Sequence, residues 1–317
     1  MYKRIELDRI SSLVLRQDYA FDYAIYYNKH ENIFHKLIEE NDYFSNSVKS
    51  LVAEEKIDHF YVKKEDRFKY KDDIQEYLTS IIKDDAVRTE EKAELIYNLA
   101  YESLTDLFEN DVTEQKINKV SSNIDNTIHL LKSDANALKL LLDVNTYDFY
   151  TYAHCIDVAT YAIAFGIYLN LPSDDLMTLG KAAIFHDLGK KNIDYEIVTK
   201  DSVLSSEEYE VIKSHPKYSV DMLKEIESVE ASLLMVIEQH HEKLNGTGYP
   251  YGLQNEQIHY LAKILSIVDI FNALTTVRSY KDALSSVQAF ELMFKSMKDE
   301  ICFSYLEKFV CFMGDFK

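Results

Sequence analysis

Two short histidine motifs carry the clearest chemical signal in this sequence. Asp187 directly follows His186, and the pair His240 and His241 precedes the run 242–250. Imidazole nitrogens and carboxylate oxygens are ligands for divalent transition metals. A carboxylate beside a histidine can bind one ion and reach a second, which a further histidine pair can help to hold. The two motifs together predict a binuclear metal centre that hydrolyses a phosphoester.

The candidate metal ligands are five of the ten histidines and two aspartates. They are His154, His186, Asp187, His215, His240, His241 and Asp269. A lone histidine is more often a core or surface residue than a ligand, but each of these five lies on or beside a predicted helix. The other histidines lack such surroundings and are interpreted as surface or core residues: His30, His35, His59, His129 and His259.

The residues around the first motif suggest how it could work. The apolar stretch 183–185 predicts a buried helix, where a charged Asp187 is costly unless it is paired or bound to metal. Consecutive helical residues point about 100° apart, so we expect Asp187 to bridge two ions and His186 to bind one. Lys190 follows on the same face and is expected to contact a phosphate oxygen. For the His-Asp pair alone, a structural hydrogen-bond network is the alternative.

The second motif is predicted to end a helix over 233–241. The segment 245–250 then forces a loop, because Gly246 and Gly248 permit positive φ and close backbone approach. We expect this loop to shape one wall of the site, or to display Tyr249 to a partner protein. A plain helix-terminating turn would not need a His-His-Glu run before it.

Composition narrows the class of protein. The 317 residues are 47% hydrophobic, and the net charge of -19 argues against a general DNA or RNA binder. A small phosphorylated substrate is still allowed, since bound divalent cations would reverse the local sign. No apolar run is long enough to insert into a membrane or to act as a leader. With three cysteines in no paired motif, we expect a cytoplasmic protein with reduced thiols.

Glycine and proline indicate two regions of different design, since every one of them lies after residue 160. Aromatic and β-branched runs at 21–27 and 59–62 predict strands, and 47–55 predicts a helix between them. The pattern becomes helical from residue 71, with helices expected at 89–108 and 114–132.

The predicted architecture is therefore mainly α. We expect a small mixed α/β module over 1–70, a helical connector over 71–133 and an all-helical catalytic domain over 134–317. The first module is expected to sense an input or mediate assembly, and the connector to transmit its state or support a homodimer.

The motifs together resemble the HD-GYP family, a branch of the HD superfamily of metal-dependent phosphohydrolases. The resemblance covers roughly residues 145–300 and depends on several motifs in order. They are His154 with 158–159, the core 186–190, His215-Pro216, the run 240–250, and Asp269, Ala273, Arg278, Tyr280 and Lys281.

The resemblance implies a cytoplasmic phosphodiesterase of second-messenger signalling that hydrolyses cyclic di-GMP to pGpG or GMP through a metal-bound hydroxide. It implies Asp187 and Lys190 as catalytic residues, and Lys190, Arg278 and Lys281 as phosphate-binding residues. One ion would take His154, His186, Asp187 and Asp269, and the other Asp187, His215, His240 and His241. The nitrogen and oxygen ligands favour iron or manganese. A protein partner such as a diguanylate cyclase could bind the 245–250 loop.

Three positions depart from the family pattern. Tyr150 stands where some members have a glutamate that supports a third metal, which favours two ions here. Asn245 and Asn272 stand where aspartate is common, and could alter loop hydrogen bonds or guanine contacts. Two alternatives follow: a receptor that binds cyclic di-GMP with little or no turnover, and an HD hydrolase of another nucleotide. The Gly-Tyr-Pro loop favours cyclic di-GMP over the latter.

Overall fold

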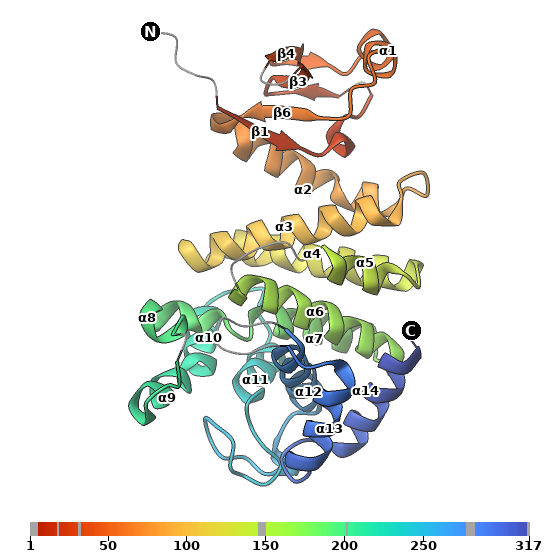
Figure 1. Ribbon diagram of the computed structural model, residues 1–317. Helices are drawn as coiled ribbons and strands as arrows, with labels where there is room; N and C mark the ends of the chain where they lie inside the picture. Colours follow the sequence, from red (N-terminus) through yellow and green to blue (C-terminus); the bar gives the residue numbers. More distant parts are fainter. Residues whose placement is uncertain are drawn as a thin grey trace. The chain divides into compact units, whose positions relative to one another are not determined.

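The chain forms two compact units, residues 1–88 and 89–317, in a computed structural model (Figure 1). The structure describes residues 6–17, 19–30, 33–144, 150–200, 202–276 and 283–315. Helices dominate, which confirms the predicted mainly-α class with a small sheet module near the N-terminus. The helix α2 (Arg67–Lys83) belongs to the first unit. The division at residues 70 and 133 stays a prediction.

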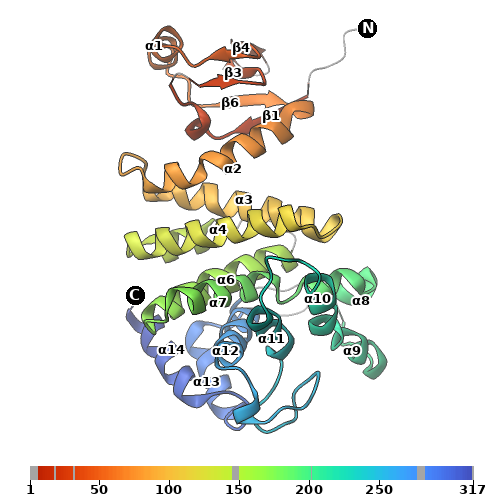
Figure 2. The same cartoon turned by 180° about the vertical axis from the view of Figure 1, so that it is seen from behind.

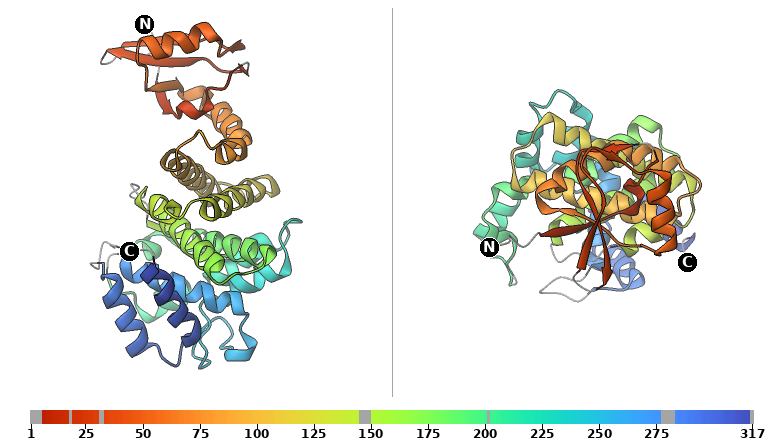
Figure 3. Two further views of the ribbon diagram at one scale, coloured as in Figure 1. Left: turned by 90° about the vertical axis from the view of Figure 1, so that its right-hand side faces the viewer. Right: turned by 90° about the horizontal axis from the view of Figure 1, so that it is seen from above.

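The first unit is built on an antiparallel sheet with the strand order β1-β6-β3-β4, seen edge-on and from above in Figure 3. A separate two-stranded pair joins β2 to β5. The bounds are β1 (Leu7–Ile10), β2 (Ala20–Phe21), β3 (Ile25–His30), β4 (Ile33–Ile38), β5 (Asp42–Tyr43), β6 (Phe60–Lys63) and α1 (Asn46–Glu54).

The predicted strand at 59–62 and helix at 47–55 are confirmed as β6 and α1. The run 21–27 is not one strand, because β2 ends at Phe21 and β3 begins at Ile25. The chain bends between them, and the buried Tyr23 donates its hydroxyl to Asp73 on α2 at 2.7 Å. A buried carboxylate needs such a partner, and this contact replaces continuous strand pairing.

The second unit is helical throughout its described residues, apart from one isolated β-bridge between Asn245 and Gln254. The predicted helices at 89–108 and 114–132 are confirmed as the first two (Figure 2). The bounds are α3 (Thr89–Glu109), α4 (Glu114–Ser133), α5 (Ala137–Asp143), α6 (Tyr150–Tyr168), α7 (Ser173–Phe185), η3 (Leu188–Asn192), α8 (Tyr195–Val198), α9 (Ser206–Ile212), α10 (His215–Leu223), α11 (Ala231–Gln239), η4 (Asn255–Gln257), α12 (Tyr260–Thr275), α13 (Ser286–Ser296) and α14 (Phe303–Asp315).

The core of this unit lies where α6, α7 and α12 meet. Three phenylalanine rings, those of Phe165, Phe271 and Phe309, are fully buried there. The ring centroid of Phe309, on α14, lies 5.0 Å from that of Phe165 and 5.2 Å from that of Phe271. Burying each such ring stabilises the fold by roughly 1.5–3 kcal/mol. Both α6 and α12 are apolar on most sides, as expected for buried helices, so their few polar residues are exceptional. No helix in the described part of the chain is both long and apolar enough to cross a membrane.

Candidate metal centre

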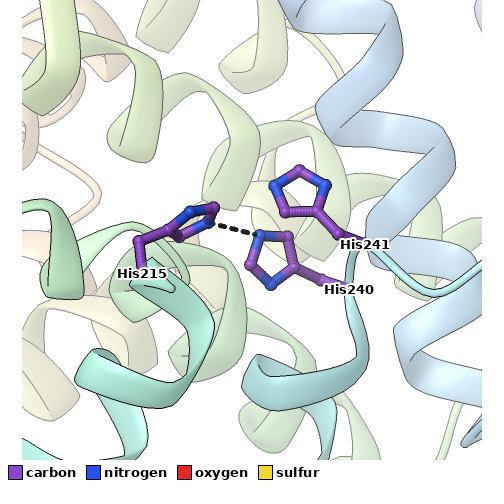
Figure 4. Close-up of side chains that lie close together, drawn as sticks. All are labelled: His215, His240 and His241. Carbon is purple, nitrogen blue, oxygen red and sulfur yellow. Dashed lines mark hydrogen bonds between the residues drawn. The ribbon is translucent and has the colours of Figure 1, made fainter. Parts of the chain in front are cut away.

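Three histidines from different parts of the chain meet at the start of α10 and the end of α11 (Figure 4). His215 is the first residue of α10, His240 caps the C-terminus of α11, and His241 follows it. One ring nitrogen from each lies within 4.8 Å of the other two. The Nε2 atoms of His215 and His240 are 3.3 Å apart. Converging imidazole nitrogens at this spacing can share one metal ion.

A second group combines His154 on α6, His186 at the end of α7 and Asp269 on α12. Their ligand atoms also lie within 4.8 Å of one another. The Asp269 Oδ1 atom is 3.1 Å from His154 Nε2 and 3.8 Å from His186 Nε2. All three side chains are buried, in keeping with the expectation that a polar residue in an apolar helix has a specific reason to be there.

Asp187 lies between the two groups. Its Oδ1 atom is 3.3 Å from His215 Nε2. Its Oδ2 atom is 3.5 Å from His186 Nε2 and 3.9 Å from His154 Nε2. The two oxygens of one buried carboxylate therefore face the two groups separately, which is the arrangement that a bridging ligand requires.

The histidine rings are held through the nitrogen that faces away from the centre. In four of them Nδ1 hydrogen-bonds a carbonyl oxygen, so Nε2 is the nitrogen that faces the centre. The acceptors are Ala183 O for His186 at 2.7 Å, Ile212 O for His215 at 2.8 Å, Ile237 O for His240 at 2.6 Å and Asn272 Oδ1 for His154 at 2.7 Å.

The buried Nε2 atom of His186 has no hydrogen-bond partner. An orphaned buried nitrogen is costly, and a bound cation would satisfy it. This observation and the nitrogen and oxygen donor set fit a divalent metal ion.

Burial controls the charge of these groups. It lowers the pKa of His215 to about 3 and that of His240 to about 4. Burial pushes the pKa of Asp187 upward, but the Lys190 ammonium at 2.6 Å and the rings of His186, His215 and His154 together outweigh this effect, and the pKa of Asp187 lies well below its usual range. At neutral pH the imidazoles of His215 and His240 are thus neutral and the Asp187 carboxylate is ionised, which are the forms that bind metal.

Comparisons with known proteins agree with this geometry. A model of the family described as HD domain matches residues 129–301, more than half of the chain. The chain belongs to the HD domain family.

Relatives of this HD domain protein carry phosphodiesterase names. A cyclic di-GMP phosphodiesterase of Pseudomonas aeruginosa is 35% identical, over 50% of this chain and 38% of the relative. A 3'3'-cGAMP-specific phosphodiesterase of Vibrio cholerae is 31% identical, over 52% of this chain and 36% of the relative. The chain thus spans well under half the length of these relatives.

A solved structure also matches, that of an HDG"Y"P protein from Bdellovibrio bacteriovorus. The TM-score is 0.69 over 98% of this chain and 100% of that one, at 19% identity, which establishes a shared fold. With the family model and the named relatives, this likeness confirms the predicted resemblance to the HD-GYP branch.

The first HD domain motif lies at the end of a helix and not within it, contrary to the sequence-based expectation. Helix α7 ends at Phe185, His186 is its C-cap, and the turn η3 follows Asp187. A close approach of the turn η3 to α10 holds the motif in this position. A Cβ atom on Gly189 would lie 2.0 Å from His215 O, so only glycine lets η3 pack against α10.

Ser219 completes this contact, and no pattern in the sequence predicted its role. Its hydroxyl accepts from Gly189 N at 2.7 Å and donates to His186 O at 3.0 Å. The motif is thereby fixed against α10, the helix that begins with His215.

The predicted loop forms one side of the site. Helix α11 covers Ala231–Gln239, so it ends two residues earlier than expected. The ring of Tyr249 packs against that of His241, with centroids 4.7 Å apart. A Cβ on Gly248 would lie 2.3 Å from Lys243 N, so the loop requires glycine there. Asn245 Oδ1 accepts from Thr247 N at 3.1 Å, a role that an aspartate oxygen could equally fill.

Glu242 was missed as a functional candidate, although it follows the histidine pair directly. It is buried, and its two oxygens accept from Tyr251 N at 2.7 Å and Leu253 N at 2.9 Å. These bonds tie the far side of the loop to the residue after His241. Two backbone bonds to one buried carboxylate are strong restraints.

Of the predicted phosphate-binding residues, only Lys190 is described, with Nζ at 2.6 Å from Asp187 Oδ2. Arg278 and Lys281 lie outside the described residues. Cys155 is buried beside His186 and Asp187. Burial raises the pKa of its thiol, so the thiol is neutral at pH 7 when no metal ion is bound.

Proposed function

We propose that this chain is a metal-dependent phosphodiesterase that hydrolyses cyclic di-GMP to pGpG, GMP or both, under the control of its N-terminal unit. The position of Asp187 carries the proposal, because its two oxygens face two separate groups of ligand atoms. Two-metal hydrolases bind their ions about 3.5–4 Å apart with a shared ligand between them. The names of the relatives supply the substrate class.

The ligands divide between two metal ions. Their nitrogen and oxygen donor atoms suit iron or manganese. The first would be held by His154, His186, Asp187 and Asp269, and the second by Asp187, His215, His240 and His241. When bound, such a pair lowers the pKa of coordinated water and neutralises charge on the phosphodiester.

The protein's own residues orient the substrate. Lys190 keeps 23% of its side chain exposed while it pairs with Asp187, so it can also reach a phosphate oxygen beside the carboxylate. Arg278 and Lys281 would supply further positive charge. Tyr249, packed on His241, closes the adjoining wall and restricts access of water to the ligands.

A second substrate has specific support. The Vibrio cholerae relative named as specific for 3'3'-cGAMP is nearly as similar as the one named for cyclic di-GMP. Both are cyclic dinucleotides with the same phosphodiester linkage, so a centre of this kind could hydrolyse either. The receptor alternative needs substrate binding with little or no turnover.

The test is to purify the protein without oxygen, measure its metal content and follow both dinucleotides by chromatography. The wild type should hydrolyse cyclic di-GMP. Asp187→Ala should lose metal and reduce turnover by about 100-fold or more. His129 is exposed and lies far from the ligands in sequence, so His129→Gln should leave metal content and turnover unchanged.

Each other outcome selects an alternative. Faster turnover of 3'3'-cGAMP would assign that substrate instead. Tight binding of cyclic di-GMP without product would assign a receptor. Wild-type activity in the Asp187→Ala protein would contradict the proposal. A homodimer, and a protein partner such as a diguanylate cyclase at the 245–250 loop, stay predictions that sedimentation and pull-down with purified partners would test.

A further inference from the structure

The imidazole of His154 is held between two residues of α12. Its Nε2 atom lies 3.1 Å from Asp269 Oδ1, and its Nδ1 atom lies 2.7 Å from Asn272 Oδ1. Asp269 and Asn272 are one helical turn apart and so share a face of the helix. Only 3% of the Asn272 residue is exposed, so this hydrogen bond is shielded from water.

The hydrogen bond that holds Nδ1 of His154 differs in kind from those that hold the other three histidines. His186, His215 and His240 each donate to a main-chain carbonyl three residues earlier, and a substitution cannot change the chemistry of that acceptor. The acceptor for His154 is a side chain. Among these four acceptors, it is therefore the only one whose chemistry a single substitution can change.

The charge of that acceptor matters for metal binding. A carboxylate that accepts from Nδ1–H makes the opposite nitrogen a better donor, and outer ligand partners of this kind change metal affinity by roughly 10–100-fold. An asparagine oxygen holds the same ring orientation without the negative charge. Asparagine and aspartate have nearly the same shape, so the two effects can be separated.

We propose that Asn272 is a positioning residue that sets the metal affinity of the His154, His186 and Asp269 group, and that its neutral amide keeps this affinity below the value that a carboxylate would give. The inference rests on the metal centre of the proposed function, but not on the identity of its substrate.

Two opposite effects follow for an Asn272→Asp protein. Without metal, a second carboxylate would face Asp269 across His154 in a buried site, where like charges repel strongly. The metal-free protein should therefore unfold at a lower temperature than the wild type. When metal is bound, the ion compensates the added charge. The melting temperature of Asn272→Asp should therefore rise more on metal binding than that of the wild type.

The experiment titrates Mn²⁺ into the metal-free full-length protein by calorimetry and records thermal unfolding with and without Mn²⁺. Asn272→Asp should tighten the binding of one ion by roughly 10–100-fold. Asn272→Leu, which removes the acceptor, should weaken the binding of one ion by a similar factor. Asn118→Asp places the same charge on the exposed face of α4, beside Glu114, and should leave the Mn²⁺ affinity and the gain in melting temperature on Mn²⁺ binding unchanged.

The results separate the possible explanations. Unchanged or weaker binding in Asn272→Asp would overturn the proposal, as would an equal gain in Asn118→Asp, which would indicate a general charge effect. If Asn272→Asp is unfolded without metal, refolding on addition of Mn²⁺ supports the proposal and failure to refold overturns it. A wild-type protein that binds no Mn²⁺, Fe²⁺ or other divalent ion would contradict the metal centre itself.

Discussion

At the scale of single residues, the two nitrogens of each imidazole have separate tasks. Nδ1 of His186, His215 and His240 is engaged by the main chain, while Nε2 faces the centre. This division fixes the ring tautomer before any ion arrives and reduces the ordering cost of binding. It also makes the metal-free site a cluster of buried neutral imidazoles, which has a consequence for stability.

The free energy of unfolding of the metal-free protein should fall as pH drops from about 6.5 towards 4. The folded-state pKa values of His215 and His240 lie below the ordinary value, at about 3 and about 4, so the unfolded chain binds protons first. Their stabilising contribution is complete above the unfolded pKa and is lost as the pH decreases, at up to about 1.4 kcal/mol per pH unit for each ring.

Urea unfolding at pH 7.5, 6.5, 5.5 and 4.5 in the presence of chelator measures this slope. A His215→Asn protein is the control, since it should show a shallower dependence on pH. Stability that stays constant or rises on acidification in both proteins would contradict the burial of neutral rings.

At the scale of elements, the site depends on two close approaches of the main chain. The turn η3 packs on α10 at Gly189, and the loop packs on the residues after α11 at Gly248. Gly189 lets the motif at 186–190 pack against His215, which is distant in sequence, and Gly248 lets the loop fold back on His241 and the two residues that follow it.

Gly189→Ala should destabilise the protein by about 1–3 kcal/mol or more, because the added methyl would overlap His215 O unless η3 moves away. The same movement would carry Asp187 from His215, so metal affinity should fall as well. Gly314→Ala is the matched control, since no atom lies within 4 Å of the added carbon. Denaturant unfolding and metal titration of both proteins would check this, and equal behaviour would refute the close approach.

Glu242→Gln should loosen the loop without unfolding the domain. The amide can replace one acceptor oxygen but presents an N–H group to the other backbone N–H, so one of the bonds to Tyr251 and Leu253 is lost. Exchange of these two amide hydrogens should become about tenfold faster or more. Glu238→Gln, which alters only the exposed bond to the Tyr251 hydroxyl, is the control. Unchanged exchange in Glu242→Gln would show that the carboxylate does not restrain the loop.

The sequence allowed the helices and ligand-bearing motifs to be predicted because their signals are local. The spacing of apolar residues in 89–108 and the pair His240-His241 can be read without knowledge of the fold. The contacts of Ser219 and Asn272 could not be predicted, since each depends on which helix packs beside it. The break between β2 and β3 was missed for the same reason, because Asp73 lies about 50 residues away on α2.

At the scale of the whole molecule, all seven candidate ligands lie in the second unit, residues 89–317. The first unit has its own sheet and its own partly buried ion pair, Arg16 with Asp73. The candidate metal ligands therefore all belong to one of the two units.

A protein that lacks residues 1–88 should therefore still fold and bind the same number of ions as the full chain. Its core is the cluster of α6, α7 and α12 and needs no side chain of the first unit. Thermal unfolding and metal content of the shortened protein would check this, with the full chain as the reference. Loss of metal without loss of helical structure would place part of the centre under control of the first unit.

The most direct test of the central claim is the number of metal ions per chain in protein purified without oxygen, for the wild type and for Asp187→Ala. We predict two ions per wild-type chain and the loss of at least one from the variant, because one carboxylate faces both ligand groups. A wild-type chain without bound metal, or a variant that keeps both ions, would contradict the account.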